Sequence, residues 1–388
     1  MTPVDIRTLA SPGMKCREGR AHPHSQRLHD YSRSPMLVYW ETTQACSLAC
    51  RHCRAEAVSC PHPDQLSHEE SLAMLRQVAE FGAPAPHLIL TGGDPLERED
   101  IYELIDEARQ LGLTVSITPA ATPKLTIEVM RKLKAHGIDS LGLSLDGSTA
   151  ERHEGIRGIR GSYQWAVEAI RNAAALGFPI QVNTLVCAET VDDLPQIYTL
   201  LSQFAITRWS LFYLIAVGRG RELQPVSPVL GEQLMRWTYE LSRQAPFAIK
   251  TTEAPSYRRV ALSAMQEEGR SGQEIGRTSV YRGFGIRDGH GIMFVSNRGD
   301  VYPAGFLPLA AGNVREHRLA NLYRDSPLFR LLHNSSQFHG KCGRCEFRQL
   351  CGGSRARAFA YTGDPAGSDP FCPYLPRESG RSTADARA

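Results

Sequence analysis

Short apolar runs alternate with segments of helical period from residue 36 onward. Continuous apolar runs are typical of strands that a parallel sheet buries on both faces. The predicted strands are 36–42, 87–93, 113–119, 140–147, 179–186 and 208–215. The predicted helices are 67–82, 97–111, 126–136, 162–176 and 193–204. These six successive strand–helix units predict an α/β fold, a partial (β/α)6 TIM-like barrel with right-handed crossovers.

Cysteine, glycine and polar residues follow the predicted strand ends. They are Cys46, Cys50 and Cys53 after the first strand, Gly92, Gly93 and Asp94 after the second, Ser144 at the end of the fourth and Asn183 near the end of the fifth. Parallel barrels build their active sites at the C-terminal ends of the strands. We therefore expect these residues to meet at one mouth of the barrel.

The pattern changes after residue 213. A helix is predicted over 228–245, the polar, Gly-rich segment 266–283 is expected to be mobile, and 291–306 is predicted to form a hairpin that turns at Asn297–Gly299. The predicted organisation is a polar N-terminal segment 1–35, a barrel domain 36–240, a partly flexible connection 241–285, a cysteine-rich domain 286–375 and a disordered tail 376–388.

Composition narrows the class of protein. Lys plus Arg number 44 and Asp plus Glu 41, and the scattered basic residues form no stripe for nucleic acid. No run approaches the ~20 apolar residues of a membrane span, and the polar start lacks a signal-peptide core, so we expect a cytoplasmic protein with no membrane partner.

Cysteines of cytosolic proteins are more often ligands or reactive thiols than disulfides. Seven of the ten lie in two groups, namely Cys46, Cys50, Cys53 and Cys342, Cys345, Cys351, Cys372.

The first group has three cysteines, whereas a closed zinc or iron–sulfur site has four ligands. A four-iron cluster held by three thiolates leaves one iron open to a chelating ligand. The alternative is a zinc site with Cys60 as fourth thiolate, because Cys60 lies seven residues after Cys53. Outside these groups, Cys16, Cys60 and Cys187 are interpreted as ordinary buried or surface thiols.

The Cys46–Cys53 motif resembles that of the radical S-adenosylmethionine (SAM) superfamily, with His52 directly before the last cysteine. The stretch Gly92–Pro95 is similar to the Gly-Gly-Glu-Pro motif of that superfamily, with Asp94 in place of glutamate, and the resemblance continues through the SLDG stretch at 144–147. It implies that the open iron of a 4Fe–4S cluster binds SAM.

The resemblance also implies roles for the other residues at the barrel mouth. Gly92, Gly93 and Asp94 would hold the methionine amino group, Ser144 the carboxylate or ribose, and the His52 region the adenine. Arg157 would pair with the carboxylate or be a solvated loop charge. Asn183 would contact the ligand or be a satisfied polar group.

Cys342, Cys345, Cys351 and Cys372 can close a second site without an external ligand. Zinc is one interpretation. The other is an auxiliary 4Fe–4S cluster, because the hairpin at 291–306 and the glycines after Cys351 resemble the SPASM extension of radical SAM enzymes. The fuller SPASM form carries further cysteines, but Ala304 and Arg355 lie where two of them are expected. The sequence therefore predicts one auxiliary cluster.

By this resemblance the chain is an enzyme that cleaves SAM reductively and abstracts a hydrogen atom from a substrate carbon. Its partners would be an external electron donor such as flavodoxin or ferredoxin and a small-molecule or peptide substrate. The substrate is expected to be a tetrapyrrole side chain, with a ribosomally made peptide as the alternative. Arg219, Arg221 and Arg287 are candidates for substrate carboxylates or are solvated loop charges. A hypothesis of another class is a zinc-binding scaffold without redox chemistry.

Overall fold

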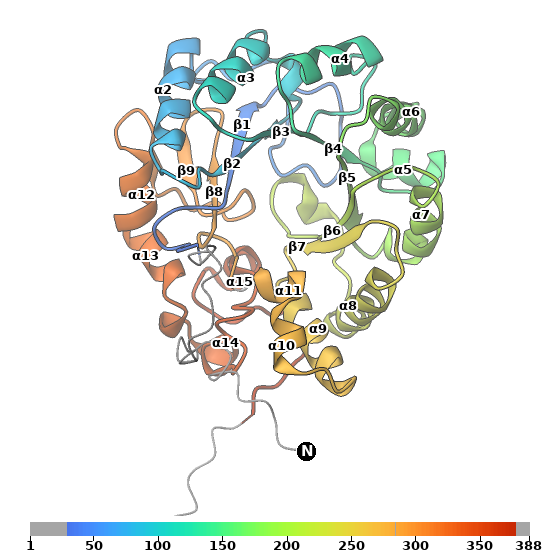
Figure 1. The fold of residues 1–388 in the computed structure, drawn as a ribbon, viewed down its shortest axis with the longest axis vertical. Helices are drawn as coiled ribbons and strands as arrows, with labels where there is room; N and C mark the ends of the chain where they lie inside the picture. The colour runs from blue at the N-terminus through green and yellow to red at the C-terminus, as the bar shows by residue number, and fades with distance from the viewer. Residues whose placement is uncertain (1–28, 284, 378–388) are drawn as a thin grey trace, which may run out of the picture.

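One curved sheet runs through the computed structural model, which describes residues 29–283 and 285–377 (Figure 1). In sheet order its strands are β10 (Gly312–Asn313), β9 (Asp300–Tyr302), β8 (Ile292–Val295), β1 (Leu37–Thr43), β2 (His87–Gly92), β3 (Val115–Ile117), β4 (Ser140–Ser144), β5 (Ile180–Val186), β6 (Arg208–Tyr213) and β7 (Ala248–Thr252). Neighbours from β8 to β7 pair in parallel, and β9 and β10 are antiparallel. The predicted barrel-type α/β fold is confirmed.

Two strands extend the six that were predicted. β7 was missed because Lys250 interrupts its short apolar run. β8 belongs to the predicted hairpin and also pairs with β1, so the C-terminal part of the chain continues the barrel sheet. Most of the predicted N-terminal segment and disordered tail, together with Cys16, lie outside the described residues.

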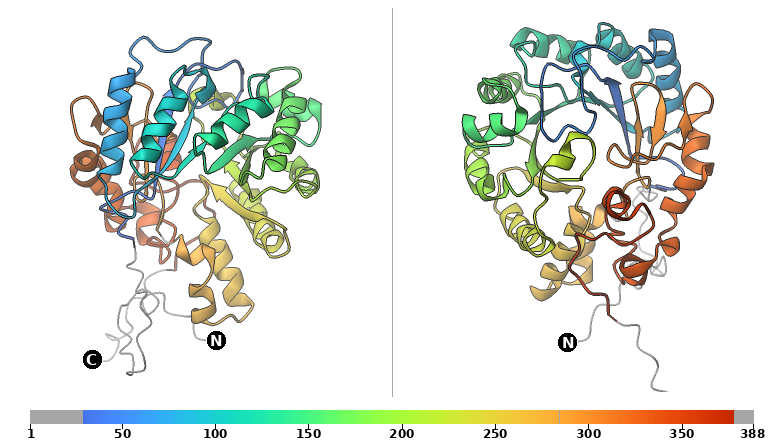
Figure 2. Two further views of the ribbon diagram at one scale, coloured as in Figure 1. Left: turned by 45° about the horizontal axis from the view of Figure 1, so that its top comes forward. Right: turned by 180° about the vertical axis from the view of Figure 1, so that it is seen from behind.

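The helices are α2 (His68–Ala79), α3 (Ile101–Gln110), α4 (Ile127–Ala135), α5 (Ala150–Arg157), α6 (Ser162–Ala175), α7 (Leu194–Leu201), α8 (Pro228–Ser242), α9 (Tyr257–Glu267), α10 (Gly272–Gly276), α11 (Ser279–Arg282), α12 (Leu319–Asp325), α13 (Pro327–His333), α14 (Gly340–Arg344) and α15 (Arg355–Thr362). Most of them cover the outer face of the sheet, whereas α14 and α15 lie at its open side (Figures 1 and 2). Each helix predicted between strands is confirmed, whereas α5 and α9 were not foreseen. None of the described helices has the length and apolar character needed to span a bilayer.

The segment 266–283, expected to be mobile, is largely helical. The end of α9 lies there, followed by α10 and α11. A capping box between Ser271 and Glu274 starts α10, and Ile275 is buried against the core. Thr278 caps the start of α11. These two caps and the buried Ile275 stabilise helical turns in a Gly-rich segment, whose mobility stays a prediction.

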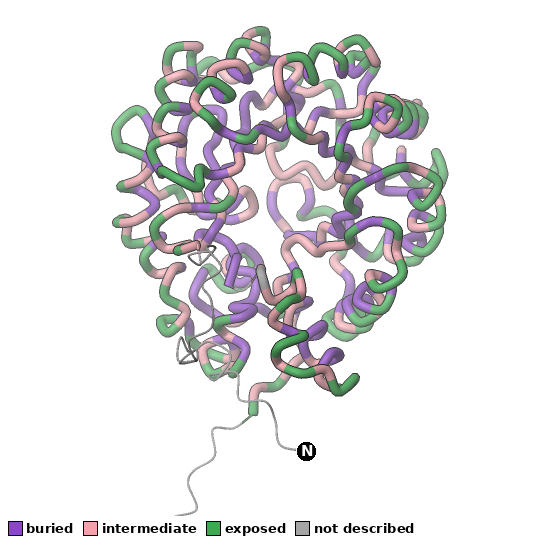
Figure 3. Tube along the Cα trace, in the orientation of Figure 1, coloured by how far each residue is buried: buried purple, intermediate pink, exposed green. Residues whose placement is uncertain are grey.

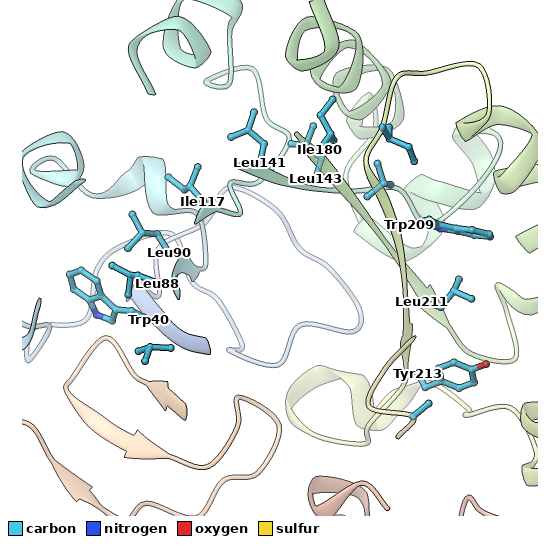
Figure 4. Close-up of a cluster of buried hydrophobic side chains, with 14 of the residues drawn as sticks. Trp40, Leu88, Leu90, Ile117, Leu141, Leu143, Ile180, Trp209, Leu211 and Tyr213 are labelled. Atoms are coloured by element: carbon cyan, nitrogen blue, oxygen red, sulfur yellow. The ribbon is translucent and has the colours of Figure 1, made fainter. Parts of the chain in front are cut away.

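The two faces of the curved sheet differ in character. Outward-facing side chains such as Trp40, Leu90 and Trp209 are buried beneath the helices (Figure 4). Figure 3 shows that buried residues gather on the strands and exposed residues on the outer helices. Alternate residues, such as Ser144 and Asn183, point inward and stay half-exposed. The interior is therefore polar and accessible, unlike the packed apolar core of a complete TIM barrel.

The C-terminal part approaches the open side of the sheet, where α15 lies between the β8–β9 edge and the β7 edge (Figures 1 and 2). The Ser354 hydroxyl donates to Oε2 of Glu253, just after β7, at 2.8 Å. The Arg357 guanidinium donates to the carbonyl of Leu214, just after β6, at 3.4 Å. The second cysteine group is thereby fixed against the end of the barrel that carries the first.

Candidate active site

The first cysteine group lies on a loop that returns to β1. The Cys46 N–H donates to the Val58 carbonyl at 2.8 Å, which closes the loop. Within it, the N–H groups of Leu48 and Ala57 point at the sulfurs of Cys46 and Cys53, at 3.3 and 3.5 Å. Such N–H groups stabilise thiolates, because they donate to sulfurs that carry the negative charge of a bound cluster.

A buried ion pair supports the third thiol of this group. The Arg157 guanidinium donates to Asp146 at 2.6 Å and lies 3.7 Å from the sulfur of Cys50. Burial raises the pKa of the Cys46 thiol to about 11 and also raises that of Cys50. Thiols in such surroundings ionise when a metal cation replaces the proton. The interpretation of Arg157 as a solvated loop charge was wrong, because its side chain is only 13% exposed.

His52 lies in the same loop, close to Arg157. Burial lowers the pKa of His52 to about 4, and the Arg157 charge acts in the same direction. The ring is therefore neutral at physiological pH, and within the described residues its Nδ1 is buried without a hydrogen-bond partner. A neutral aromatic ring with a free polar atom fits a place beside a bound heteroaromatic group.

The glycine motif is held against the start of the cysteine loop. The Gly93 N–H donates to the Thr43 carbonyl at 2.8 Å, and the Asp94 N–H donates to the Ala45 carbonyl at 2.7 Å. A Cβ on Gly93 would lie 2.2 Å from that Ala45 oxygen. The backbone at Gly93 and Asp94 therefore packs directly against the backbone at the start of the cysteine loop. Part of the reason for the glycines is this contact within the chain.

Asp94 is fully buried. Its Oδ1 accepts the N–H groups of Leu96 and Ala120, at 3.1 and 3.3 Å, so it ties the ends of β2 and β3 together. Burial raises the pKa of Asp94 to about 6. The two N–H donors act in the opposite direction and lower this pKa, but burial has the larger effect. Oδ2 has no partner among the described residues. A buried carboxylate oxygen of this kind fits a cationic amino group of a ligand.

Ser144 and Asn183 are register partners on β4 and β5 and face the barrel interior. Asn183 accepts a hydrogen bond from the Gln181 side chain at 2.8 Å, and its amide nitrogen remains available to a ligand. The mouth therefore gathers the predicted residues from the ends of β1, β2, β4 and β5.

The second cysteine group surrounds a single cavity, which Cys342, Cys345, Cys351 and Cys372 all line. The Gly353 N–H donates to the sulfur of Cys351 and the Asp369 N–H to that of Cys342, both at 3.3 Å. Gly353 has a φ of 68°, and a Cβ there would lie 3.0 Å from the Cys342 sulfur. The paired glycines after Cys351 thus let the backbone pass directly over the thiols.

Arg355, which lies where a further cysteine was expected, is completely buried. Its guanidinium donates to the carbonyls of Gly353, Pro365 and Gly367 and lies 3.5 Å from the sulfur of Cys342. Arg355 therefore fills this position with a cation that contacts the four-thiol site.

The four thiols around this cavity match the ligand number of a zinc site and of a closed 4Fe–4S cluster. Zinc needs four ligands at about 2.0–2.3 Å from one centre. In a 4Fe–4S cluster each thiolate binds a different iron.

Arg219 and Arg287, two of the arginines considered for substrate carboxylates, bind backbone carbonyls of the chain itself. Arg219 donates to the carbonyls of Cys50 and Ala57, at 2.9 and 3.1 Å, so it anchors the cysteine loop. Arg287 is buried and donates to the carbonyls of Gly285 and Leu332. Neither is a solvated loop charge, so that interpretation was wrong for Arg219 and Arg287. Arg221 is exposed.

Sequence analysis missed an acidic residue at the end of β7. Glu253 has a φ of 59°, in the left-handed region that non-glycine residues rarely adopt. Burial raises the pKa of Glu253 to about 8, and the nearby Asp288 charge adds to the effect. No local sequence pattern indicates this glutamate, whose side chain accepts a hydrogen bond from Ser354 in a distant part of the chain.

Comparison with known proteins identifies the family. The model of the Radical SAM superfamily matches residues 40–201. The AdoMet-dependent heme synthase of Methanosarcina barkeri is 35% identical over 348 residues, covering 89% of this chain and 98% of the relative. The mycofactocin maturase MftC of Mycobacterium tuberculosis is 28% identical, covering 89% and 86%.

The solved structure of Streptococcus suis SuiB bound to S-adenosylmethionine has the same fold. Its TM-score is 0.66 at 17% identity, and the match covers 88% of this chain and 78% of SuiB. These matches are to enzymes, so the hypothesis of a zinc-binding scaffold without redox chemistry is wrong.

Gly93→Ala tests the backbone contact that positions the cysteine loop. The new Cβ would clash with the Ala45 carbonyl, so we expect the free energy of unfolding to fall by about 1–3 kcal/mol and iron uptake at the first site to fall with it. Gly276→Ala in α10 is the matched control, since a Cβ there meets nothing within 4 Å. Chemical denaturation and iron analysis measure both effects. If the two variants have the same free energy of unfolding and the same iron uptake, Gly93 does not position the cysteine loop.

Proposed function

We propose that this chain, which belongs to the radical SAM superfamily, oxidises carboxyethyl side chains of an iron tetrapyrrole. Enzymes of this superfamily carry a 4Fe–4S cluster and bind SAM. The observation that carries the substrate assignment is the match to a heme synthase over 98% of its length at 35% identity, against 28% for a peptide maturase.

In this proposal Cys46, Cys50 and Cys53 hold the first cluster, and the loop N–H groups and Arg157 support their sulfurs. The strand-end residues bind SAM. Asp94 offers its unpaired Oδ2 to the methionine amino group, beside the backbone of Gly92 and Gly93, and His52 lies beside the adenine. Ser144, Asn183 and Arg157 complete the cofactor contacts.

Cys342, Cys345, Cys351 and Cys372 hold one auxiliary 4Fe–4S cluster in the domain 286–375. Four thiolates close that site, and Arg355 leaves no further cysteine beside it for a second one. Arg259, Lys341 and Arg348 also line the cavity and offset the negative charge of a bound cluster. An external one-electron donor, a flavodoxin or ferredoxin, reduces the first cluster.

Conversion of a carboxyethyl group to a vinyl group removes one hydrogen atom, one CO2 and one electron. When bound, SAM and the first cluster supply the radical that takes the hydrogen atom, and the auxiliary cluster supplies the electron acceptor. The residues of the chain hold the substrate carbon at the mouth and exclude water from the interior. A peptide substrate is the second candidate, which the likeness to the mycofactocin maturase supports.

Incubation with iron coproporphyrin III, a tetracarboxylate porphyrin, tests the substrate. With dithionite and SAM, we expect products lighter by the mass of CO2 plus two hydrogen atoms per converted side chain, together with 5′-deoxyadenosine. Cys46→Ala should abolish both products. Cys60→Ala is the matched control and should retain both, because Cys60 is an exposed thiol outside both groups. Mass spectrometry that finds 5′-deoxyadenosine but no modified porphyrin contradicts the tetrapyrrole assignment.

Cys345→Ala tests the division of labour between the two sites. We expect the loss of about four irons per chain, with 5′-deoxyadenosine still formed and porphyrin oxidation lost, because only the second step needs the auxiliary acceptor. Both products are measured in protein whose circular dichroism matches the parent. Full porphyrin turnover without the second cluster contradicts the role given to the auxiliary site.

A further inference from the structure

One row of inward-facing residues crosses the barrel from the proposed SAM contacts to the far strand. The pairing registers place Ser144 of β4 beside Asn183 of β5, Asn183 beside Ser210 of β6, and Ser210 beside Lys250 of β7. Register partners share a face of the sheet. Trp209 and Leu211, which flank Ser210, point outward (Figure 4), so Ser210 and the Lys250 beside it point inward.

Lys250 has no counter-ion among the described residues. Its ammonium forms neither an ion pair nor a hydrogen bond there. Burial lowers the pKa of Lys250 to about 8, and the one nearby charge that contributes is another cation, Arg208. The side chain is half-exposed, yet protein surrounds it, which places it in the accessible barrel interior.

A purely structural role explains this lysine poorly. An unpaired ammonium that protein surrounds costs free energy, and a neutral residue at this position would avoid that cost. A lysine that only extends its head to bulk water keeps its ordinary pKa. The cost is recovered when an anion binds in the interior and pairs with the ammonium.

We propose that Lys250 anchors the substrate by pairing its ammonium with a substrate carboxylate inside the barrel. This inference rests on the proposed function, in which the substrate carries carboxylates. Lys250 lies on β7, whereas the residues assigned to SAM lie on or after β1, β2, β4 and β5. A carboxylate near Lys250 therefore belongs to the substrate, and the methionine carboxylate of SAM is the competing source that the experiment distinguishes.

The test compares the reconstituted parent enzyme with Lys250→Met, Lys250→Arg and the control Lys132→Met, which removes an exposed lysine of α4. Coproporphyrin III and its tetramethyl ester are titrated by porphyrin fluorescence, and SAM is titrated separately. We expect Lys250→Met to weaken coproporphyrin binding about 10-fold to 100-fold, because a charged hydrogen bond is lost. Lys250→Arg and Lys132→Met should bind like the parent within about 3-fold, and all four proteins should bind the ester equally weakly.

Unchanged coproporphyrin binding by Lys250→Met overturns the proposal. A loss confined to SAM binding also overturns it, since the carboxylate at Lys250 would then be that of the cofactor. Iron content and circular dichroism equal to the parent show that the variant is folded and loaded.

A second measurement is independent of the tetrapyrrole assignment. If the parent binds no coproporphyrin, the proposed function fails, and the lysines are then labelled by reductive 13C-methylation. Sodium propionate is the probe, and the Lys250 resonance is assigned by its absence in Lys250→Met. A saturable shift of that resonance, with none at Lys132, supports a carboxylate site at Lys250. No shift, or equal shifts at both lysines, overturns it.

Discussion

The backbone contact between the end of β2 and the start of the cysteine loop determines where the chemistry of this protein takes place. Gly93 and Asp94 donate to the carbonyls of Thr43 and Ala45, one residue before Cys46. Because Gly93 has no side chain, the two segments meet at a distance that any Cβ would prevent. Two backbone hydrogen bonds therefore join the start of the cysteine loop to the end of β2, and the roles proposed for His52, Asp94 and Ser144 depend on this contact.

Charge divides the molecule into functional regions. Arg157 contacts the sulfur of Cys50 and Arg219 donates to its carbonyl, so both hold the cysteine loop. Arg355 contacts the sulfur of Cys342 in the second thiol site. These cations are paired with carbonyls, a carboxylate or sulfur, whereas Lys250 has no partner in the described part of the chain. Cations already paired within the protein stabilise its loops and clusters, and an unpaired cation in the interior is suited to a ligand.

Much of this fold and site is predictable from local sequence, and the rest depends on distant contacts. The cysteine spacings, the glycine motif and the helices between strands are local patterns, and the fold and family that they indicated are confirmed. β7 was missed because the residue that gives it a function, Lys250, also breaks its apolar pattern. The left-handed Glu253 and the buried Arg287 depend on segments far away in the chain, which no local pattern reveals.

The proposed function requires two separate iron–sulfur sites in the chain, one with three thiolates and one with four. Iron, acid-labile sulfide and zinc are therefore to be measured in anaerobically purified and reconstituted protein. We expect about eight irons and about eight sulfides per chain, with Mössbauer parameters of 4Fe–4S clusters. One or two zinc ions per chain, with no sulfide after reconstitution, would show that the sites bind zinc instead.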